Sequence, residues 1–252
     1  SRPAVVSSAG SYVALPAALA ASMLRIPIHL HQQDVRPSLT NRLLSPFASA
    51  ITVTFPQSLN DFPAAKTSLT GNPVRGDLSY QDRSQAISLF QFDARVPTVL
   101  ILGGGTGAAS LNALVWESLE QLVACAQVIH CTGRGKMTVV AEHPRYRAFE
   151  FLGTELGAAY AAADVVVCRA GMGTLTEAAA LAKPVIVVPL PGTHQEQNAA
   201  AFARQNAVVL LLQPGLSALD FASKICELVH DRPQRDNLGR NIATMMPANA
   251  AV

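Results

Sequence analysis

Short continuous apolar runs alternate along the chain with longer segments in which apolar residues recur at helical spacing. In the first part, residues 4–7, 26–31 and 51–55 are strand-like, and residues 15–24 and 39–48 have the helical pattern. In the second part, the strand-like runs are 98–102, 127–131, 149–151, 165–168, 185–188 and 208–211, with helices expected at 79–90, between the strands and at 218–230. Uniformly apolar runs of this kind are typical of parallel strands buried on both faces. The pattern predicts an α/β protein built from parallel sheets.

An Asn-Pro step divides the chain into two parts. Asn72 precedes Pro73 and is biased towards extended backbone, so the chain turns or crosses over there. We expect a boundary near Arg75, with one Rossmann-like domain over residues 1–75 and a second, doubly wound domain over residues 76–235. The first domain is expected to be incomplete, because its sheet begins almost at Ser1. Residues 236–252 read as a polar tail that we expect to return to the first domain.

Composition narrows the class of protein. With 252 residues, 50% of them hydrophobic and 14% charged, the chain is globular rather than disordered. A net charge of +2 without a run of Lys or Arg argues against a nucleic-acid partner. No apolar helix reaches the roughly 20 residues that a membrane span needs. The four cysteines show no CxxC spacing, so we expect reduced core residues in cytoplasm: Cys125, Cys131, Cys168 and Cys226.

A glycine turn follows the strand-like run at 98–102. Residues 103–108, GGGTGA, fit G-x-G-x-x-A between a strand and a helix, which occurs in dinucleotide-binding Rossmann domains. The next strand ends in Arg134 rather than in the usual acid, so a hydride-transfer enzyme would have to use NADP. A turn that only packs helix on strand is the simpler alternative.

A second glycine turn lies in residues 164–177, DVVVCRAGMGTLTE. A helix N-terminus there would favour a phosphate group, and Glu177 would accept hydrogen bonds from ribose hydroxyls. Thr174 and Glu177 also have the spacing of a capping box, in which Glu177 only caps its own helix. Both alternatives remain open at the level of sequence.

Polar side chains follow two other strands. The loop 189–198, PLPGTHQEQN, carries groups that suit sugar hydroxyls or a solvated loop, namely His194, Gln195, Gln197 and Asn198, with a helix expected from about Asn198. His29 and His31 lie on one face of the strand at 26–31, but no third metal ligand accompanies them. The chain also has no Asp-x-Asp motif. We therefore expect neither a metal nor a cofactor.

Taken in order, these segments resemble the MurG family, bacterial transferases that add N-acetylglucosamine from its UDP donor to undecaprenyl-pyrophosphoryl-muramyl-pentapeptide (lipid I). The resemblance runs from the first residues to about Gln213. The segments that carry it are 10–12 (GSY), 31–34 (HQQD), 39–42 (LTNR), 72–75 (NPVR), 103–108 (GGGTGA), 168–177 (CRAGMGTLTE) and His194-Gln195.

The resemblance implies a GT-B fold of two Rossmann-like domains and an inverting transfer to the C4 hydroxyl of the acceptor's muramyl sugar. It places uracil near Leu152, ribose on Glu177, and diphosphate between the 103–108 loop, with Gly105 and Thr106, and the start of the following helix. Arg75 and Gln195 would contact phosphate or sugar, Asp34 would reach the sugar, and His31 is a weak candidate for catalysis. The implied donor site is completed by Met172, Gly173, Thr174, Leu175, Thr176, His194 and Asn198. The implied partners are UDP-N-acetylglucosamine, lipid I and, peripherally, the cytoplasmic face of the bacterial membrane.

Three departures from the family pattern change these expectations. Gly105 stands where the family has serine, and Asp34 stands where it has Asn. The family's first glycine-rich loop, with its candidate base histidine, would precede Ser1, so we expect this chain to be an N-terminally truncated piece. Two other functions stay open: a UDP-sugar-binding module that needs a separate acceptor chain, and a UDP-sugar transferase for another lipid.

Overall fold

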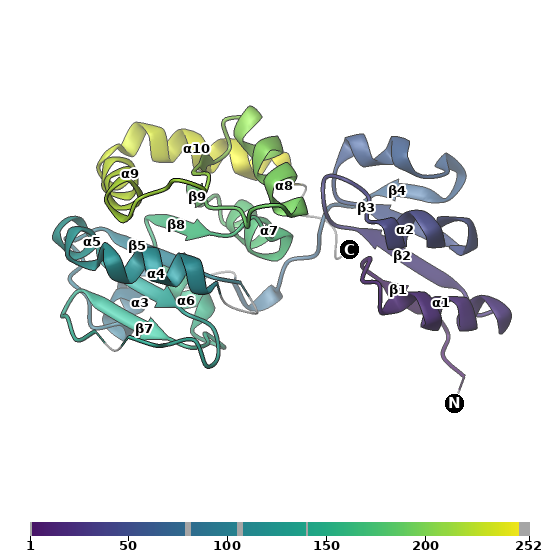
Figure 1. Cartoon of the computed structure of the whole chain (residues 1–252), viewed down its shortest axis with the longest axis horizontal. Coiled ribbons are helices and arrows are strands. Elements are labelled where there is room, and N and C mark those ends of the chain that lie inside the picture. Colours follow the sequence, from purple (N-terminus) through teal and green to yellow (C-terminus); the bar gives the residue numbers. More distant parts are fainter. Residues whose placement is uncertain (1, 79–81, 105–107, 140, 247–252) are drawn as a thin grey trace. The chain divides into compact units, whose positions relative to one another are not determined.

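The computed structural model describes residues 2–78, 82–104, 108–139 and 141–246. The chain divides into two compact units (Figure 1): unit 1 comprises residues 1–73 and 246–252, and unit 2 comprises residues 74–245. Each unit has its own parallel sheet. The predicted fold class, two parallel α/β domains, is therefore confirmed.

Unit 1 is a four-stranded parallel sheet in the order β1-β2-β3-β4. Its strands are β1 (Val6–Ser8), β2 (Ile28–Gln32), β3 (Ala50–Val53) and β4 (Thr67–Leu69), and its helices are α1 (Ala14–Met23) and α2 (Leu39–Leu44), with 3₁₀ turns η1 (Ser45–Phe47), η2 (Pro56–Asp61) and η3 (Ala64–Lys66). Ile28 and Leu30 alternate with polar neighbours along β2 and are fully buried. The short strand β4 was not predicted, since its residues TSL lack an apolar run.

Unit 2 is a six-stranded parallel sheet in the order β10-β9-β8-β5-β6-β7. Its strands are β5 (Thr98–Leu102), β6 (Gln127–Cys131), β7 (Tyr146–Phe149), β8 (Val165–Cys168), β9 (Val185–Val187) and β10 (Val209–Leu210). Counted from β5, this is the doubly wound order 6-5-4-1-2-3. The order reverses between β5 and β8, and the crevice beyond the carboxyl ends of these two strands is where such folds bind ligand.

Helices cover both faces of this sheet. The helices are α3 (Arg83–Leu89), α4 (Ala109–Glu117), α5 (Leu119–Cys125), α6 (Leu156–Ala162), α7 (Met172–Ala180), α8 (His194–Arg204), α9 (Ala218–His230) and α10 (Arg232–Met245), with a 3₁₀ turn η4 (Gly76–Leu78). Side chains of α4, α5 and α9 form one apolar core with alternate residues of the central strands, such as Val99 and Val167. The intervening residues Leu100 and Val166 are also fully buried, so the opposite face is covered too, where α6 contacts β5.

The segment after His230 is a helix rather than the expected polar tail. α10 is polar over most of its surface, but Leu238, Gly239 and Ile242 form a narrow buried stripe. A Cβ atom on Gly239 would lie 2.3 Å from the carbonyl oxygen of Ala182, so only glycine allows this approach. The helix therefore depends on packing against the end of α7. The sequence did not predict it, because α10 has few apolar residues.

Two of the four cysteines are joined, contrary to the expectation that all are reduced. Cys125 of α5 and Cys226 of α9 form a disulfide, although 101 positions separate them in the sequence. They meet because α5 and α9 pack side by side on the same face of the sheet. Cys131 and Cys168 are free thiols.

Candidate functional site

Both glycine turns lie at the point where the strand order of unit 2 reverses. Gly103 and Gly104 follow β5, and residues 169–171 follow the neighbouring β8. Gly104 has φ +82°, a left-handed conformation that favours glycine, and no atom lies within 4 Å of where its Cβ would be. The two turns thus leave open space at the ligand-binding edge of the sheet. Gly105 and Thr106 lie outside the described residues.

Glu177 does not cap its helix. α7 begins at Met172 with Gly171 as N-cap, so Thr174 is already inside the helix and Glu177 lies in its second turn. The carboxylate instead accepts a hydrogen bond from the hydroxyl of Tyr160, at 2.9 Å from Oε2. Burial and the nearby carboxylate raise the pKa of Tyr160 well above its ordinary value, so this hydroxyl remains a donor. The capping-box interpretation is therefore wrong, and Tyr160 fixes the orientation of Glu177.

A cavity of about 270 Å³ opens at this edge, and we call it the switch-point cavity. Five of the predicted site residues line it: Arg75, Leu152, Gly173, Thr174 and Glu177. No atom lies within 4 Å of where a Cβ on Gly173 would be, so the start of α7 is accessible from the cavity. The first turn of a helix presents backbone N–H groups and partial positive charge, both of which favour an anion.

Other predicted residues near this turn lie in the core. The side chains of Met172, Leu175 and Thr176 are buried, and the Thr176 hydroxyl donates to the carbonyl oxygen of Met172 at 2.6 Å. Only their backbone can face a ligand.

Arg169 is a buried cation at the carboxyl end of β8. Its guanidinium donates to the carbonyl oxygens of Val188, at 2.8 Å, and Pro189, and to the hydroxyl of Ser110 on α4 at 2.7 Å. Within the described ranges it contacts no carboxylate. A guanidinium stays charged even when burial lowers its pKa, so an anion in the adjacent crevice would be favoured.

The loop after β9 is shorter than predicted. α8 begins at His194 rather than near Asn198, because the Thr193 side chain accepts the N-cap hydrogen bond from the backbone N–H of Gln195. Asn198 is fully buried and donates to the carbonyl oxygen of Ala170, which ties α8 to the glycine turn. The Gln195 side chain accepts from the N–H of Leu190. His194, Gln195 and Asn198 do not line the switch-point cavity.

Sequence reasoning missed the part of the cavity wall that comes from the ends of β5, β6 and β7 and from the start of α6. Its members are Leu102, Cys131, Gly133, Glu150, Phe151 and Leu156. Cys131 ends β6, and Phe151 follows β7 with the Arg134 guanidinium 4.6 Å above its ring. Cys131 and Phe151 could have been identified from the sequence by their positions at or just after the carboxyl ends of strands. Strand β7 was expected at 149–151, which hid Glu150 and Phe151 inside a strand.

His29 and His31 of unit 1 belong to a hydrogen-bonded chain rather than a metal site. Thr52 Oγ1 lies 2.9 Å from His29 Nε2 and 2.8 Å from His31 Nδ1, and His31 Nε2 lies 3.0 Å from Asn72 Oδ1. Because an amide oxygen only accepts, Nε2 of His31 carries the proton. Burial lowers the pKa of His31, which keeps the ring neutral. With both ring nitrogens engaged, His31 is better placed to orient neighbours than to act as a base.

A cavity of about 440 Å³ in unit 1 is lined by His29, His31, Gln33 and Thr52 among others. Asp34 follows β2 but is not part of this lining. In the described part of the chain, no cluster of three His, Cys, Asp or Glu residues could hold a metal ion.

Comparison with known proteins gives a consistent set of similarities. Residues 98–251 match the family model "Glycosyltransferase family 28 C-terminal domain", and residues 1–53 match "Glycosyltransferase family 28 N-terminal domain". The chain is 38% identical over 220 residues to the UDP-N-acetylglucosamine--N-acetylmuramyl-(pentapeptide) pyrophosphoryl-undecaprenol N-acetylglucosamine transferase of Lachnoclostridium phytofermentans. That match covers 85% of this chain but 62% of the relative. The transferase of the same name from Shouchella clausii is 34% identical, with 92% and 67% covered.

Solved structures give the same result. The crystal structure of Acinetobacter baumannii MurG superposes with a TM-score of 0.74 at 28% identity, covering 98% of this chain and 70% of that chain. A UDP-N-acetylglucosamine 2-epimerase from Listeria monocytogenes has the same TM-score, 0.74, at only 13% identity, with 99% and 72% covered, which is a likeness of fold alone.

Proposed function

Since this chain belongs to glycosyltransferase family 28, and within it to the MurG transferases, we propose that it moves N-acetylglucosamine from UDP-N-acetylglucosamine to the C4 hydroxyl of the muramyl sugar of lipid I. The product is lipid II, the disaccharide precursor of peptidoglycan. The chain spans 62% of the length of one curated relative and 67% of another, so the activity of the whole protein is part of this proposal.

The observation that carries the proposal is the switch-point cavity, because it combines an anion site with an oriented carboxylate. Gly104 and Gly173 leave space for a diphosphate beside the first turn of α7. Glu177, held by Tyr160, lines the same cavity and suits the two hydroxyls of a ribose. Leu152 and Phe151 supply an apolar wall for the uracil ring. These groups together fit a uridine diphosphate better than a dinucleotide.

The reaction follows from that placement. The acceptor oxygen forms a bond to the anomeric carbon while the bond from that carbon to the diphosphate oxygen breaks, and UDP leaves with the electron pair. A general base takes the proton of the acceptor hydroxyl. Negative charge grows on the departing diphosphate, where the backbone N–H groups at the start of α7 would stabilise it. The charge of the buried Arg169 at the end of β8 would add to this at longer range.

A Glu177→Gln variant tests the donor site. Glutamine still accepts the Tyr160 hydrogen bond, so the fold should be unaffected, but the ribose loses a charged acceptor. We expect UDP to bind about tenfold more weakly in calorimetry, since a hydrogen bond to a charged group exceeds a neutral one by about 1 to 1.5 kcal/mol. Glu117→Gln, an exposed residue of α4 outside the cavity, is the matched control. Equal UDP affinity in both variants would refute the site. Because the chain spans 62% of the length of one relative, the reaction is tested in a chain extended to the length of that relative, and lack of lipid I-dependent UDP release there would refute it.

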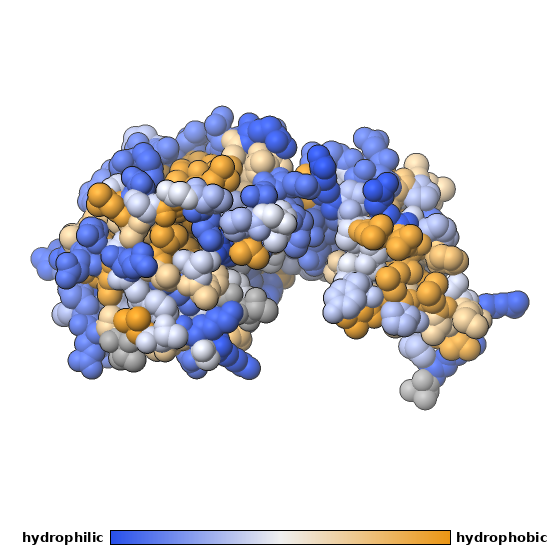
Figure 2. All heavy atoms as spheres, viewed as in Figure 1, coloured by the Kyte–Doolittle hydropathy of each residue, from blue (hydrophilic) through white to orange (hydrophobic). Residues whose placement is uncertain are grey.

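Unit 1 supports peripheral contact with a membrane. No helix among the described residues is long and apolar enough to cross a bilayer. However, large apolar side chains of α1, α2 and their flanks are exposed, among them Tyr12 at 78%, Met23 at 86% and Leu39 at 71% (Figure 2). We propose that this face rests on the cytoplasmic side of the membrane that carries lipid I. The sequence did not reveal it, because α1 is apolar on all sides rather than amphipathic.

A Met23→Glu variant tests the membrane contact. We expect vesicle binding to weaken about tenfold in cosedimentation, because insertion of one large apolar side chain contributes about 1.5 to 3 kcal/mol. Leu219→Glu, at a position on α9 of unit 2 that is 64% exposed, is the control. The proposal fails if both variants bind vesicles like the unmodified chain.

A further inference from the structure

Unit 2 has a second and larger cavity, of about 660 Å³, at the opposite edge of its sheet. Asp164 and Pro184 in its wall directly precede β8 and β9, so the cavity lies at the amino ends of the strands. We call it the basic cavity, because five cationic side chains line it: Arg83, Lys183, Arg232, Arg235 and Arg240. It shares no residue with the switch-point cavity.

Carboxylates in the wall neutralise only part of this charge. Arg83 Nη2 lies 2.8 Å from Asp164 Oδ2. Arg232 Nε lies 3.8 Å from Asp236 Oδ2, a loose and exposed pair. These are the two acidic residues that line the cavity, so five cations face two carboxylates. The excess is three positive charges.

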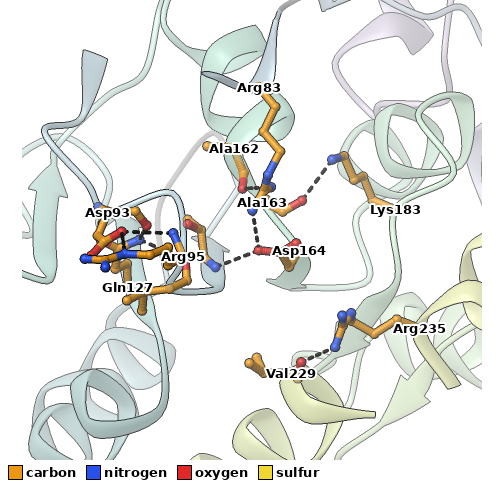
Figure 3. A network of polar contacts seen from close by, with 12 residues as sticks. Arg83, Asp93, Arg95, Gln127, Ala162, Ala163, Asp164, Lys183, Val229 and Arg235 are labelled. Atoms are coloured by element: carbon orange, nitrogen blue, oxygen red, sulfur yellow. Dashed lines mark hydrogen bonds and ion pairs between the residues drawn. The ribbon is translucent and has the colours of Figure 1, made fainter. Parts of the chain in front are cut away.

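Some of the cationic side chains donate hydrogen bonds to carbonyl groups near the ends of helices, but these contacts do not use all of their N–H donors. Lys183 Nζ donates to the carbonyl oxygen of Ala163, after the end of α6, at 2.9 Å, and Arg235 donates to Val229 near the end of α9 (Figure 3). Such contacts are a common way to satisfy the last carbonyl groups of a helix. They engage one of the three ammonium protons of Lys183. Within the described ranges, Arg240 makes no hydrogen bond or ion pair.

The pKa of Lys183 agrees with an incomplete neutralisation of the positive charge in the basic cavity. The pKa of its ammonium group is lowered to about 8: burial is the largest cause, Asp164 opposes it, and Arg83 adds to it. The charged form is therefore poorly compensated by the residues of the cavity. An anion bound beside Lys183 would supply the missing negative charge.

We propose that the basic cavity binds a phosphate group, either free or in the headgroup of an anionic lipid. Phosphate fits better than a single carboxylate, because a dianion balances more of the excess charge and several oxygens can each accept from a guanidinium or ammonium donor. The four charged residues of α10 are spaced to face one side of that helix, at positions 232, 235, 236 and 240, so α10 forms the phosphate-facing wall.

The double variant Arg232→Gln/Arg240→Gln tests this site in the complete chain. Both side chains are exposed, so their loss should leave the fold intact. Pyrophosphate binding is measured by calorimetry, and vesicle binding is measured by cosedimentation with and without phosphatidylglycerol. We expect the double variant to weaken one of these interactions about tenfold or more, because it removes two charge-assisted contacts. The UDP affinity of the double variant should be unchanged.

The control is Arg204→Gln, an exposed arginine at the end of α8 that does not line the cavity. Loss of pyrophosphate binding alone identifies a free phosphate ligand, and loss of binding to phosphatidylglycerol vesicles alone identifies a lipid headgroup. The proposal is overturned if neither interaction changes in the double variant, or if Arg204→Gln changes it equally.

Discussion

Single side chains make the two ends of the unit 2 sheet chemically different. At the carboxyl end, Tyr160 holds Glu177 at the wall of a cavity that also exposes helix N–H groups. At the amino end, Lys183 and Arg83 donate to the carbonyl groups at the end of α6. The first end presents Glu150, Glu177 and Arg75 beside backbone donors, and the second presents cations in excess. The two cavities are therefore expected to select different ligands.

His130 should make the stability of unit 2 depend on pH. Its ring lies fully buried on β6, between the hydroxyl of Tyr146 at 2.8 Å and Oδ1 of Asn112 at 3.0 Å. Burial lowers its pKa to about 4, below the value of about 6.5 expected in the unfolded chain. The unfolded chain therefore binds the proton first as pH falls, and stability present above pH 6.5 is lost between about 6.5 and 4.

The expected loss from His130 is about 2.4 kcal/mol between pH 7 and pH 4.5. Urea unfolding at the two pH values measures it, and a His130→Gln variant serves as the comparison. That variant should be less stable at pH 7 but lose less on acidification. The same acid-induced loss in both chains would contradict a neutral, buried His130.

Cys131 offers a direct probe of the switch-point cavity. Its thiol lines the cavity, whereas Cys168 is fully buried and Cys125 is in a disulfide. Burial raises the pKa of Cys131, so alkylation should be slow at pH 7 and faster as pH rises. We expect saturating UDP to slow maleimide labelling at least about tenfold, since the nucleotide would have to leave before the reagent enters.

Mass spectrometry of the labelled peptide measures the protection of Cys131. A Cys131→Ser variant should show almost no labelling under the same conditions. If UDP binds but labelling continues at an unchanged rate, the nucleotide lies elsewhere.

Element positions were predictable where the hydrophobic pattern was continuous. The strands 98–102, 127–131 and 165–168 were predicted at their observed bounds, because central parallel strands are apolar throughout. Helix starts were harder to predict from the sequence. The N-cap of α7 is Gly171 and that of α8 is Thr193, whereas Thr174 and Asn198 looked equally suitable as caps. Side-chain capping patterns compete locally, and packing decides among them.

The disulfide between α5 and α9 gives a test at the scale of elements. The denatured, unreduced chain should titrate two thiols, and the reduced chain four. Reduction, or a Cys226→Ala variant, should lower the stability of unit 2 by about 2 to 4 kcal/mol, because a long loop is no longer closed in the unfolded state. UDP affinity should not change, since neither cysteine lines the switch-point cavity. Four titratable thiols without reductant would show that the pair is not joined.

Which residues share a site depended on the arrangement of the whole molecule. Parallel strands bring Gly104, Cys131 and Gly173 together from distant segments, and the doubly wound order was expected. The contribution of β7 was missed because that strand was expected three residues late. Cys131 at the end of β6 was missed although that strand was predicted at its observed bounds. The disulfide and α10 were missed for a related reason: both depend on helix packing between segments far apart in the sequence.

Separate cores in the two units predict two unfolding transitions. Unit 1 packs around β2 and β3, and unit 2 packs around β5 and β8. In scanning calorimetry, UDP should raise the midpoint of one transition, since every residue of the switch-point cavity belongs to unit 2. At a concentration of 100 times Kd, the stabilisation is about 2.7 kcal/mol. The Glu177→Gln variant should show a smaller shift, and a UDP-induced rise of both midpoints would contradict a site within unit 2.

The position of β5 in the sheet also affects how readily backbone amide hydrogens beside the proposed donor site exchange with solvent. β5 pairs with β6 on one side and β8 on the other, and its residues are almost completely buried. Amide hydrogens in such a strand exchange with deuterium only when the whole unit opens. We therefore expect β5 and β8, which Gly103 and Arg169 directly follow, to be among the slowly exchanging strands. At Gly103 and Arg169 themselves, nucleotide binding would then have little backbone left to order, and we expect its entropic cost to come mainly from groups farther from these strand ends.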